Sequence, residues 1–518
     1  MVTLGELLRG IDGVTFELRG DAAVPIERVS VDSRSVVPGD LFVALPGTRT
    51  DGARFVADAC RRGAAAVAGA GARTLKVPKG VPFVVTKEPA RFLARAAAAF
   101  YGDPAAGLTM VGVTGTNGKT TVTYLLEAIW RAAGVSPGVL GTINYRFDGV
   151  AEPAPLTTPP AHEIFARLAA MRAAGATHVA MEASSHALVQ DRTFGIPWDA
   201  AIFTNLGRDH MDFHRDEKDY LRAKARLFTA LDASPKARRV AVLNAGDARV
   251  AELAKGITSP VVTFGTAGHV RAEDVEMTLA GTRATLVAGT ERVAIQTRLV
   301  GIGHLENVLA AAATTHALGT PLATIAAALA DFPGVPGRLE LVEAGQDFTV
   351  LVDYAHTPDA LAGVLGSLRA LVPARLVCVF GCGGDRDRGK RPLMGDAVGR
   401  HVDLAILTSD NPRTEDPMRI LDDAEPGLER AGLRLLPNLA SRTARGYLVQ
   451  SDRSQAIASA LTSAQPGDCV VIAGKGHEDY QIIGTEKRPF DDRATARRVL
   501  TGRGMRRAGA SGEDPTPS

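Results

Sequence analysis

The chain has 518 residues and a formal net charge of +2; 46% of its residues are hydrophobic and 22% are charged. This length is too great for one hydrophobic core, and roughly three domains are expected. The composition is typical of a soluble globular protein, the small net charge argues against a large nucleic-acid surface, and no segment approaches the apolar run of about 20 residues that spans a bilayer.

The start of the chain and its cysteines indicate a cytoplasmic protein. Residues 1–6 lack the basic start and apolar core of a signal peptide. The four cysteines are scattered and fit no zinc-binding spacing: Cys60, Cys378, Cys382 and Cys469. We therefore expect reduced thiols and a cytoplasmic enzyme that does not insert into a membrane.

The predicted elements form an α/β protein with three domains. Residues 1–105 combine short strands at 29–31 and 41–45 with a helix at 53–63. From 106 to 334, apolar strands alternate with helical stretches, which indicates a mainly parallel sheet covered by helices. The strands of this second domain are expected at 108–113, 178–181, 200–203, 240–243 and 261–264.

A turn-rich stretch, Pro333–Gly337, marks the second domain boundary. After it, residues 335–500 resume the alternation and predict a Rossmann-like α/β domain. Its strands are expected at 349–352, 376–380, 404–407 and 469–473. The tail, residues 501–518, is rich in Gly, Arg, Ser and Pro and is expected to be disordered.

Residues 108–121 form an apolar strand, a glycine-rich turn and the start of a helix. The N–H groups of such a turn and the positive end of the helix dipole bind anions. Lys119 would reach the β- and γ-phosphates of a nucleotide, and the Thr120 hydroxyl would ligate Mg²⁺. Val113 stands where the strict P-loop pattern has glycine, so a turn without nucleotide is the alternative. The order of strand, Gly-Lys-Thr and helix favours a nucleoside triphosphate, held by Gly115, Thr116, Asn117, Gly118, Lys119, Thr120 and Thr121.

Polar segments follow the predicted strands at their carboxyl ends, where open α/β sheets bind ligands. These segments are Glu182–His186, Thr204–His214, Asp353–His356, Gly381–Arg388, Ser409–Arg413 and Gly474–Glu478. Structural loops do not need so many charges and glycines. We therefore expect two facing sheets with functional edges.

Glu182 and two histidines are the candidate metal ligands. A carboxylate at the end of a strand can hold Mg²⁺ beside Thr120, and the alternative is a solvated loop acid. His210 and His214 lie four residues apart and could share a helical face as zinc ligands. Because neither a third ligand nor a metalloprotease glutamate accompanies them, a single histidine in an Mg²⁺–nucleotide site, His210, is the preferred interpretation.

Charges of both signs alternate in residues 385–391. Asp385 and Asp387 separate the basic residues, and no aromatic side chains are interleaved with them: Arg386, Arg388, Lys390 and Arg391. This pattern favours a site for an acidic small molecule over a nucleic-acid patch.

Together, the motifs resemble the Mur ligases in order and spacing. They are Gly115–Thr121, Glu182–His186, Asn205–His210, Asp353–Pro358 and Asp410–Arg413, with Gly474–Tyr480 as a further specific match. The resemblance covers nearly the whole chain except the tail. The Gly-Lys-Thr motif alone is shared with folate polyglutamate ligases.

The resemblance implies one domain each for a UDP-sugar, ATP and an incoming amino acid. It adds Asn307 and Asp353 to the ATP site. It also implies that Lys224 is carbamylated (N6-carboxylysine), so that the side chain becomes an anion near Mg²⁺. Lys119 and His210 complete the implied catalytic set. Contacts to the UDP-muramyl dipeptide are implied for Val31, Ser33, Thr48, Arg49, Thr50, Thr157, Thr158, Ser184, Gln190 and Arg192. Contacts to diaminopimelate are implied for Arg386, Asp410, Asn411, Pro412, Arg413, Gly474 and Glu478.

The implied reaction is ATP-dependent addition of meso-2,6-diaminopimelate to UDP-N-acetylmuramoyl-L-alanyl-D-glutamate through an acyl phosphate. It belongs to cytoplasmic peptidoglycan precursor synthesis and is expected of a monomer. A lysine-adding or folylpolyglutamate-type ligase is the alternative, which Arg413 and residues 31–34 disfavour. A P-loop GTPase switch should carry an Asn-Lys-x-Asp segment, and the sequence has none.

Overall fold

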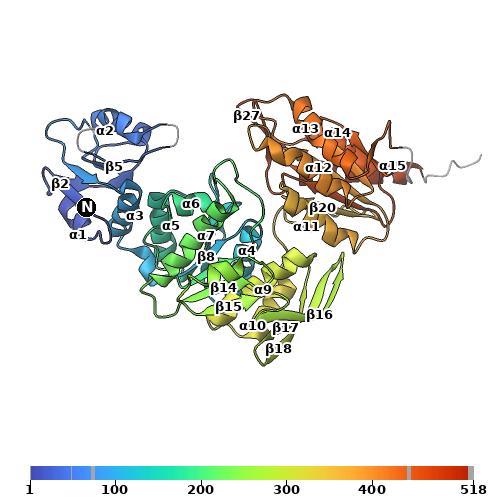
Figure 1. Cartoon of the computed structure of the whole chain (residues 1–518), viewed down its shortest axis with the longest axis horizontal. Coiled ribbons are helices and arrows are strands. Elements are labelled where there is room, and N and C mark those ends of the chain that lie inside the picture. The colour runs from blue at the N-terminus through green and yellow to red at the C-terminus, as the bar shows by residue number, and fades with distance from the viewer. Residues whose placement is uncertain (1, 48–49, 72–75, 440–444, 511–518) are drawn as a thin grey trace, which may run out of the picture.

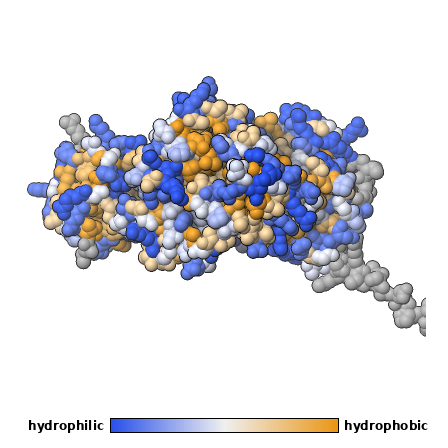
Figure 2. All heavy atoms as spheres, turned by 90° about the horizontal axis from the view of Figure 1, so that it is seen from below, coloured by the Kyte–Doolittle hydropathy of each residue, from blue (hydrophilic) through white to orange (hydrophobic). Residues whose placement is uncertain are grey.

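The computed structural model describes residues 2–47, 50–71, 76–439 and 445–510. Three main sheets follow one another along the chain, in an elongated arrangement with the amino-terminal sheet at one end (Figure 1). The α/β class predicted from the alternation of strands and helices is confirmed. Seen from below, the surface is a mosaic of hydrophilic and hydrophobic side chains along its length (Figure 2).

The amino-terminal sheet has five strands in the order β2-β7-β6-β5-β4. Helix α3 packs against α5 of the central unit, so one apolar cluster runs through both. The elements are β1 (Val2–Thr3), α1 (Leu4–Arg9), β2 (Phe16–Arg19), β3 (Pro25–Ile26), β4 (Arg28–Ser30), β5 (Asp40–Ala44), α2 (Val56–Arg61), β6 (Ala66–Gly69), β7 (Phe83–Thr86) and α3 (Pro89–Phe100), with 3₁₀ turns at Ser33–Ser35, Gly52–Phe55 and Pro104–Gly107.

The central sheet has eleven strands in the order β11-β10-β9-β12-β8-β13-β14-β15-β16-β17-β18. The middle strands pair in parallel as predicted, and antiparallel strands extend both edges. Its strands are β8 (Thr109–Thr114), β9 (Pro137–Leu140), β10 (Asn144–Phe147), β11 (Val150–Pro153), β12 (His178–Glu182), β13 (Ala200–Phe203), β14 (Val240–Asn244), β15 (Val261–Phe264), β16 (Val270–Thr278), β17 (Gly281–Ala288) and β18 (Glu291–Thr297).

Helices cover both faces of the central sheet, which explains why its parallel strands are continuously apolar. One apolar cluster lies under α4, α9 and α10, and the other lies under α5 and α7. The helices are α4 (Lys119–Ala132), α5 (Ala161–Ala173), α6 (Ser185–Val189), α7 (Glu217–Asp232), α8 (Val250–Ala254), α9 (Ile302–Ala317) and α10 (Leu322–Asp331).

The carboxy-terminal sheet has seven strands in the order β19-β20-β25-β21-β22-β24-β23, parallel except for edge strand β19. Helices α11, α12 and α13 cover one face, and α14 and α15 cover the other. The elements are β19 (Glu340–Leu341), β20 (Thr349–Asp353), α11 (Pro358–Arg369), β21 (Leu376–Cys382), a 3₁₀ turn (Arg388–Lys390), α12 (Arg391–Gly399), β22 (Leu404–Ser409), α13 (Pro417–Arg430), β23 (Arg434–Leu435), β24 (Gly446–Val449), α14 (Arg453–Ser463), β25 (Cys469–Ala473), the hairpin β26 (Tyr480–Ile483) and β27 (Glu486–Pro489), and α15 (Asp492–Ala510).

Helix α15 corrects the expectation of a disordered tail from residue 501. The helix continues to Ala510 because Ala496 and Leu500 are buried against the sheet and hold its first turns in place. The stretch that follows contains three glycines, at 502, 504 and 509, among Arg, Met and Ala residues, which are good helix formers. Residues 511–518 lie outside the described part of the chain. Within the described ranges, every helix lacks the length or the apolar character needed to span a bilayer.

Candidate active site

The glycine-rich turn after β8 is shaped for close approach of its backbone to a ligand. Gly115 and Gly118 have φ angles of 144° and 88°, which side-chain-bearing residues rarely adopt. A Cβ on Gly115 would lie 1.8 Å from Thr204 Oγ1, and one on Gly118 would lie 2.2 Å from Asn307 Oδ1. Asn307 of α9 therefore packs directly on the turn, as expected of a residue at the ATP site.

Two lysines point at the same carbonyl of this turn. Lys119 Nζ donates to Gly115 O and Thr116 O at 2.9 Å each, and Lys224 Nζ donates to Gly115 O at 2.7 Å. Burial lowers the pKa of Lys119. Burial, and then the charge of Lys119, lower the pKa of Lys224 well below its usual range. The structure thus brings together both lysines of the predicted catalytic set.

Glu182 ends β12 beside the same turn. It is fully buried, and its carboxylate accepts hydrogen bonds from Thr142 N at 2.8 Å and Thr142 Oγ1 at 2.9 Å. The described ion pairs do not include Glu182, and the charge of Lys119 acts on it from nearby. A buried carboxylate whose hydrogen-bond donors are neutral fits a hard cation such as Mg²⁺.

His210 lies on the loop after β13, in the left-handed region with φ of 56°. Its ring Nε2 is 3.3 Å from Asp209 Oδ2, and its ring packs edge-on against His186 at 4.8 Å. Burial lowers the pKa of His210 to about 4, so its imidazole is neutral at pH 7 and has a free lone pair. His214 instead faces Ser185 Oγ at 2.9 Å, which separates the two histidines that spacing alone could have joined at zinc.

The residues expected to hold the muramyl dipeptide form one hydrogen-bonded cluster around Thr158. Its hydroxyl donates to Glu182 O at 2.7 Å and accepts from Ser184 N at 3.1 Å. Arg192 Nη1 donates to Thr158 O at 2.7 Å and Arg192 Nη2 donates to Gln190 Oε1 at 2.7 Å. Thr157 Oγ1 lies 3.1 Å from Thr142 Oγ1, which connects this cluster to Glu182.

The predicted UDP contacts lie in the amino-terminal unit. Val31 follows β4, and Ser33 is buried at the start of a 3₁₀ turn. Thr50 is exposed on the loop before the next turn. Thr48 and Arg49 lie outside the described residues, and the role of all five residues stays a prediction.

A cavity of about 420 Å³ lies between the carboxyl edges of the central and carboxy-terminal sheets. The central sheet contributes His186, Arg208, Asp209, His210 and Asp212. The other wall contains six of the seven residues expected to bind diaminopimelate: Arg386, Asp410, Asn411, Arg413, Gly474 and Glu478. The seventh, Pro412, is not among the lining residues. The two sheet edges therefore face each other as expected, and their functional role stays a prediction.

Arg413 is held with part of its guanidinium free. Its backbone has φ of 51°, and its N–H donates to Ile482 O at 3.1 Å, so the β26 hairpin fixes this conformation. Nη1 donates to Gly384 O at 2.8 Å, while the hydrogen bonds of the described residues leave Nε and Nη2 without an acceptor. A planar fork with free donors at a cavity wall suits a carboxylate.

Two residues have contacts that the motifs did not predict. Both oxygens of Asp353 accept backbone N–H groups, from Leu339 and Ala355 at 2.7 Å each, so Asp353 organises the start of the carboxy-terminal unit and its nucleotide contact stays a prediction. Arg338 reaches across to the central unit and donates to Thr120 Oγ1 at 3.2 Å. The turn-rich stretch Pro333–Gly337 was interpreted only as a domain boundary. A single arginine directly after it carries no sequence pattern that predicts a contact with Thr120.

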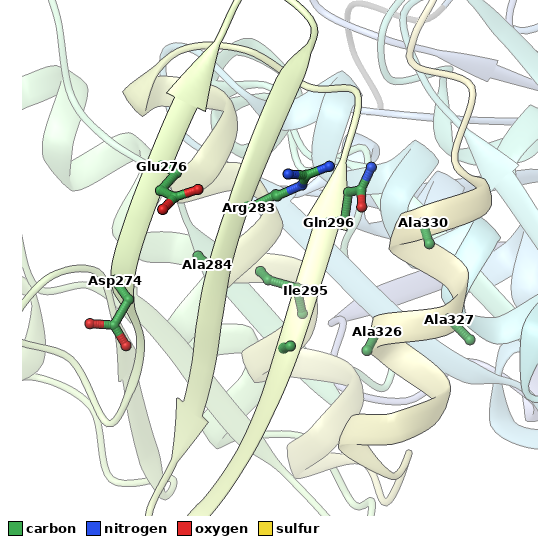
Figure 3. Close-up of a pocket in the computed structure, with 10 residues that line it drawn as sticks. Asp274, Glu276, Arg283, Ala284, Ile295, Gln296, Ala326, Ala327 and Ala330 are labelled. Atoms are coloured by element: carbon green, nitrogen blue, oxygen red, sulfur yellow. The ribbon is translucent and has the colours of Figure 1, made fainter.

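A second hollow, of about 550 Å³, lies far along the central sheet from these motifs (Figure 3). It is bounded by β16, β17 and β18 on one side and by the alanines of α10 on the other: Ala326, Ala327 and Ala330. None of the predicted site residues lines it. The predicted site residues gather instead around the cavity between the two sheets.

Comparison with known proteins identifies the origin of this arrangement. Three family models match: the Mur ligase family catalytic domain over residues 25–101, the Mur ligase middle domain over 113–315 and the Mur ligase glutamate ligase domain over 337–476. The chain belongs to the Mur ligase family. The order of the three models along this Mur ligase follows the order of its three main sheets.

Individual relatives cover nearly the whole chain. The UDP-N-acetylmuramoyl-L-alanyl-D-glutamate–2,6-diaminopimelate ligase of Geobacter metallireducens is 46% identical over 94% of this chain and 97% of its own. A solved structure of a ligase of the same name is 32% identical, with a TM-score of 0.68 and coverage of 97% and 99%. The MurF ligase of Thermotoga maritima in complex with ADP shares the fold at 19% identity, with a TM-score of 0.62 and coverage of 93% and 98%.

Proposed function

We propose that this Mur ligase joins meso-2,6-diaminopimelate to UDP-N-acetylmuramoyl-L-alanyl-D-glutamate at the expense of ATP, in peptidoglycan precursor synthesis. The observation that supports the proposal is the shared cavity, which is lined by His210 on one side and by six of the residues predicted to bind diaminopimelate on the other. The names of relatives that match over nearly their full length support the same substrates. Nucleotide and amino-acid substrates of this kind fit a reaction in the cytoplasm.

In the first step, the D-glutamate carboxylate of the bound dipeptide attacks the γ-phosphate of ATP, which gives an acyl phosphate and ADP. The backbone N–H groups of residues 115–118 and the N-terminus of α4 would hold the phosphates. Lys119 would leave its two carbonyl acceptors and neutralise charge on the transferring group. The cluster around Thr158 and Arg192 would orient the dipeptide.

The donor set beside the turn fits Mg²⁺. Thr120, Glu182, His210 and a carbamylated Lys224 would hold it. When bound, Mg²⁺ supplies positive charge against the phosphate oxygens. Arg338 already contacts Thr120, so it would bring a positive charge from the carboxy-terminal unit to the same phosphate oxygens.

A carbamate on Lys224 would resolve the repulsion between the two lysines. Two ammonium groups on one carbonyl oxygen are unfavourable, and burial and the charge of Lys119 lower the pKa of Lys224, which favours its neutral amine. A neutral amine adds to CO₂ and loses a proton, which converts the side chain into an anion. That anion would attract both Lys119 and a metal ion.

In the second step, an amine of diaminopimelate attacks the acyl carbonyl and expels phosphate. The far end of diaminopimelate carries one carboxylate and one ammonium. Arg413 and Arg386 would bind the carboxylate, and Glu478 and Asp410 would take the ammonium. No side-chain nucleophile is needed, because the reaction relies on positioning of the three substrates.

The test is phosphate release by the full chain with UDP-N-acetylmuramoyl-L-alanyl-D-glutamate, ATP and Mg²⁺. Candidate amino acids are added one at a time, and the muramyl product is identified by its mass. The proposal predicts release that depends on both the muramyl dipeptide and diaminopimelate. Release that needs neither of them would contradict it.

A further inference from the structure

Lys475 is a fully buried lysine behind the wall of the cavity. Its Nζ lies 3.2 Å from Asp410 Oδ1 and 3.6 Å from Glu478 Oε2, the two carboxylates that line the amino-acid side. Two hydrogen bonds fix the ammonium, one to Asn411 Oδ1 at 2.9 Å and one to Tyr480 O at 2.8 Å. The lysine does not line the cavity itself, so it acts on a ligand only through these neighbours.

Asp410 is paired with this lysine but keeps room for a second donor. Its side chain is 7% exposed, and Oδ1 faces the Lys475 ammonium at 3.2 Å without a well-aligned hydrogen bond. Lys475 also donates to Asn411 and Tyr480. An ammonium of a bound ligand would therefore add a donor to this carboxylate oxygen.

The charges of this half of the cavity do not cancel. Two carboxylates and one ammonium leave a net charge of −1. The nearby Arg453 does not change this sum, because it forms a buried pair with Asp492 at 2.7 Å. Burial, and then the charge of Asp410, raise the pKa of Glu478, while the charge of Lys475 acts in the opposite direction.

We propose that Lys475 is a positioning residue that sets the acidic half of the amino-acid site to a single negative charge and so matches it to one substrate ammonium. The inference rests on the proposed function. Without Lys475, Asp410 and Glu478 would repel each other across Asn411, whose Nδ2 donates to Glu478 Oε2 at 3.0 Å. One of them would take up a proton or move, and the ammonium would lose a partner.

The first test replaces the lysine by an uncharged side chain of similar length, Lys475→Met, in the full chain. KM for diaminopimelate should rise on the order of tenfold or more, because a buried charge network loses its only central cation. kcat and the KM values for ATP and the muramyl dipeptide should stay within about threefold. The matched control is Lys255→Met, at the exposed carboxyl end of α8 in the central unit, which should leave every constant unchanged.

A second variant separates charge from structure. Lys475→Met with Glu478→Gln restores a net charge of −1, and the glutamine oxygen can still accept from Asn411. KM for diaminopimelate should recover toward the parent value relative to Lys475→Met alone. An unchanged KM in the single variant, or no recovery in the double variant, would overturn the proposal.

The parent enzyme gives a measurement that does not depend on folding of either variant. 2-Aminopimelate keeps the far carboxylate of diaminopimelate but lacks its far ammonium. Its kcat/KM should be lower by on the order of a hundredfold or more, because the site keeps an unneutralised buried charge. Equal kcat/KM values for diaminopimelate and 2-aminopimelate would contradict the proposal that the site is matched to one substrate ammonium. A parent enzyme that does not ligate diaminopimelate at all would instead contradict the proposed function.

Discussion

At the scale of single residues, the unusual feature is a carbonyl oxygen shared by two lysines. Gly115 O accepts from both Lys119 and Lys224, and both amines have a lowered pKa. The Gly-Lys-Thr motif predicted Lys119 and the family resemblance predicted Lys224. Neither predicts that the two lysines meet, because residues 119 and 224 lie on different helices. The contact depends on how α7 packs beside β8.

The first prediction concerns Lys119. Lys119→Ala removes the charge directed at the transferring phosphate and should lower kcat by about a hundredfold or more. Initial-rate measurements of phosphate release check this. The control variant is Lys236→Ala in the same unit. Lys236 lies away from the glycine-rich turn, and its Nζ donates hydrogen bonds to Ala106 O and Leu108 O. A loss of only a few fold would remove the basis for assigning residues 115–121 to ATP.

The second prediction concerns the carbamate on Lys224. Lys224→Ala should be nearly inactive, and short carboxylic acids should restore part of the activity by occupying the anionic position. A carbamate forms only on the unprotonated amine, so the lowered pKa of Lys224 extends its formation to lower pH. Labelling with ¹³C-bicarbonate should give a protein carbamate signal that declines together with activity as the pH falls. An active enzyme without that signal would refute the modification.

The third prediction concerns the choice of amino acid. Arg413→Ala removes the free guanidinium donors at the cavity wall, so the KM for diaminopimelate should rise strongly and its advantage over lysine should shrink. A charge-assisted fork of this kind contributes on the order of 1.5–3 kcal/mol. The constants are measured for both amino acids in the parent and the variant. Equal losses for the two would mean that Arg413 does not recognise the far carboxylate.

At the scale of elements, the buried parallel strands were predictable and the edge strands were not. The runs that became β8, β12, β13, β20, β21, β22 and β25 are buried on both faces, so they are continuously apolar in the sequence. Strands β16 and β11 are largely exposed and carry acidic residues, so no apolar run marks them. Their pairing is set by neighbouring strands that the sequence alone does not reveal.

Among the candidate site residues, some were also predictable from the sequence and others were not. Residues within strand-end motifs, such as Glu182 and Arg413, could be found from the sequence because their types are those of nucleotide and carboxylate chemistry. Arg338 and Lys475 could not be assigned, because their roles depend on which groups the fold brings beside them.

The fourth prediction concerns helix α15, which extends into the tail that was expected to be disordered from residue 501. Arg453 and Asp492 are both completely buried and join α14 to the start of α15. Arg453→Met leaves Asp492 buried without a partner and should destabilise the carboxy-terminal unit by about 3–5 kcal/mol. Denaturant unfolding, with hydrogen exchange of α15, measures the loss.

The control for that prediction is the exposed pair of Arg488 and Glu486, whose side chains are 57% and 66% exposed. Arg488→Met should change stability by less than about 1 kcal/mol. If both variants lose the same amount, the buried pair does not anchor the helix.

At the scale of the whole molecule, two sheet edges face one another across the cavity. The glycine-rich turn belongs to one edge and the predicted amino-acid site to the other. Arg208 N connects the two units by donating to Asp359 Oδ2 at 2.7 Å. Arg338 makes a second bridge at Thr120. An acyl phosphate formed on the central unit would therefore lie at the wall of the cavity that holds the incoming amine.

The central claim is that this cavity selects diaminopimelate by its far carboxylate and ammonium. The most direct measurement is kcat/KM of the parent chain for meso-diaminopimelate and for L-lysine, with the UDP-muramyl dipeptide and ATP saturating. Lysine leaves the guanidinium of Arg413 without its partner, and the account predicts a preference for diaminopimelate of about 10⁴. Equal kcat/KM values for the two amino acids would contradict it.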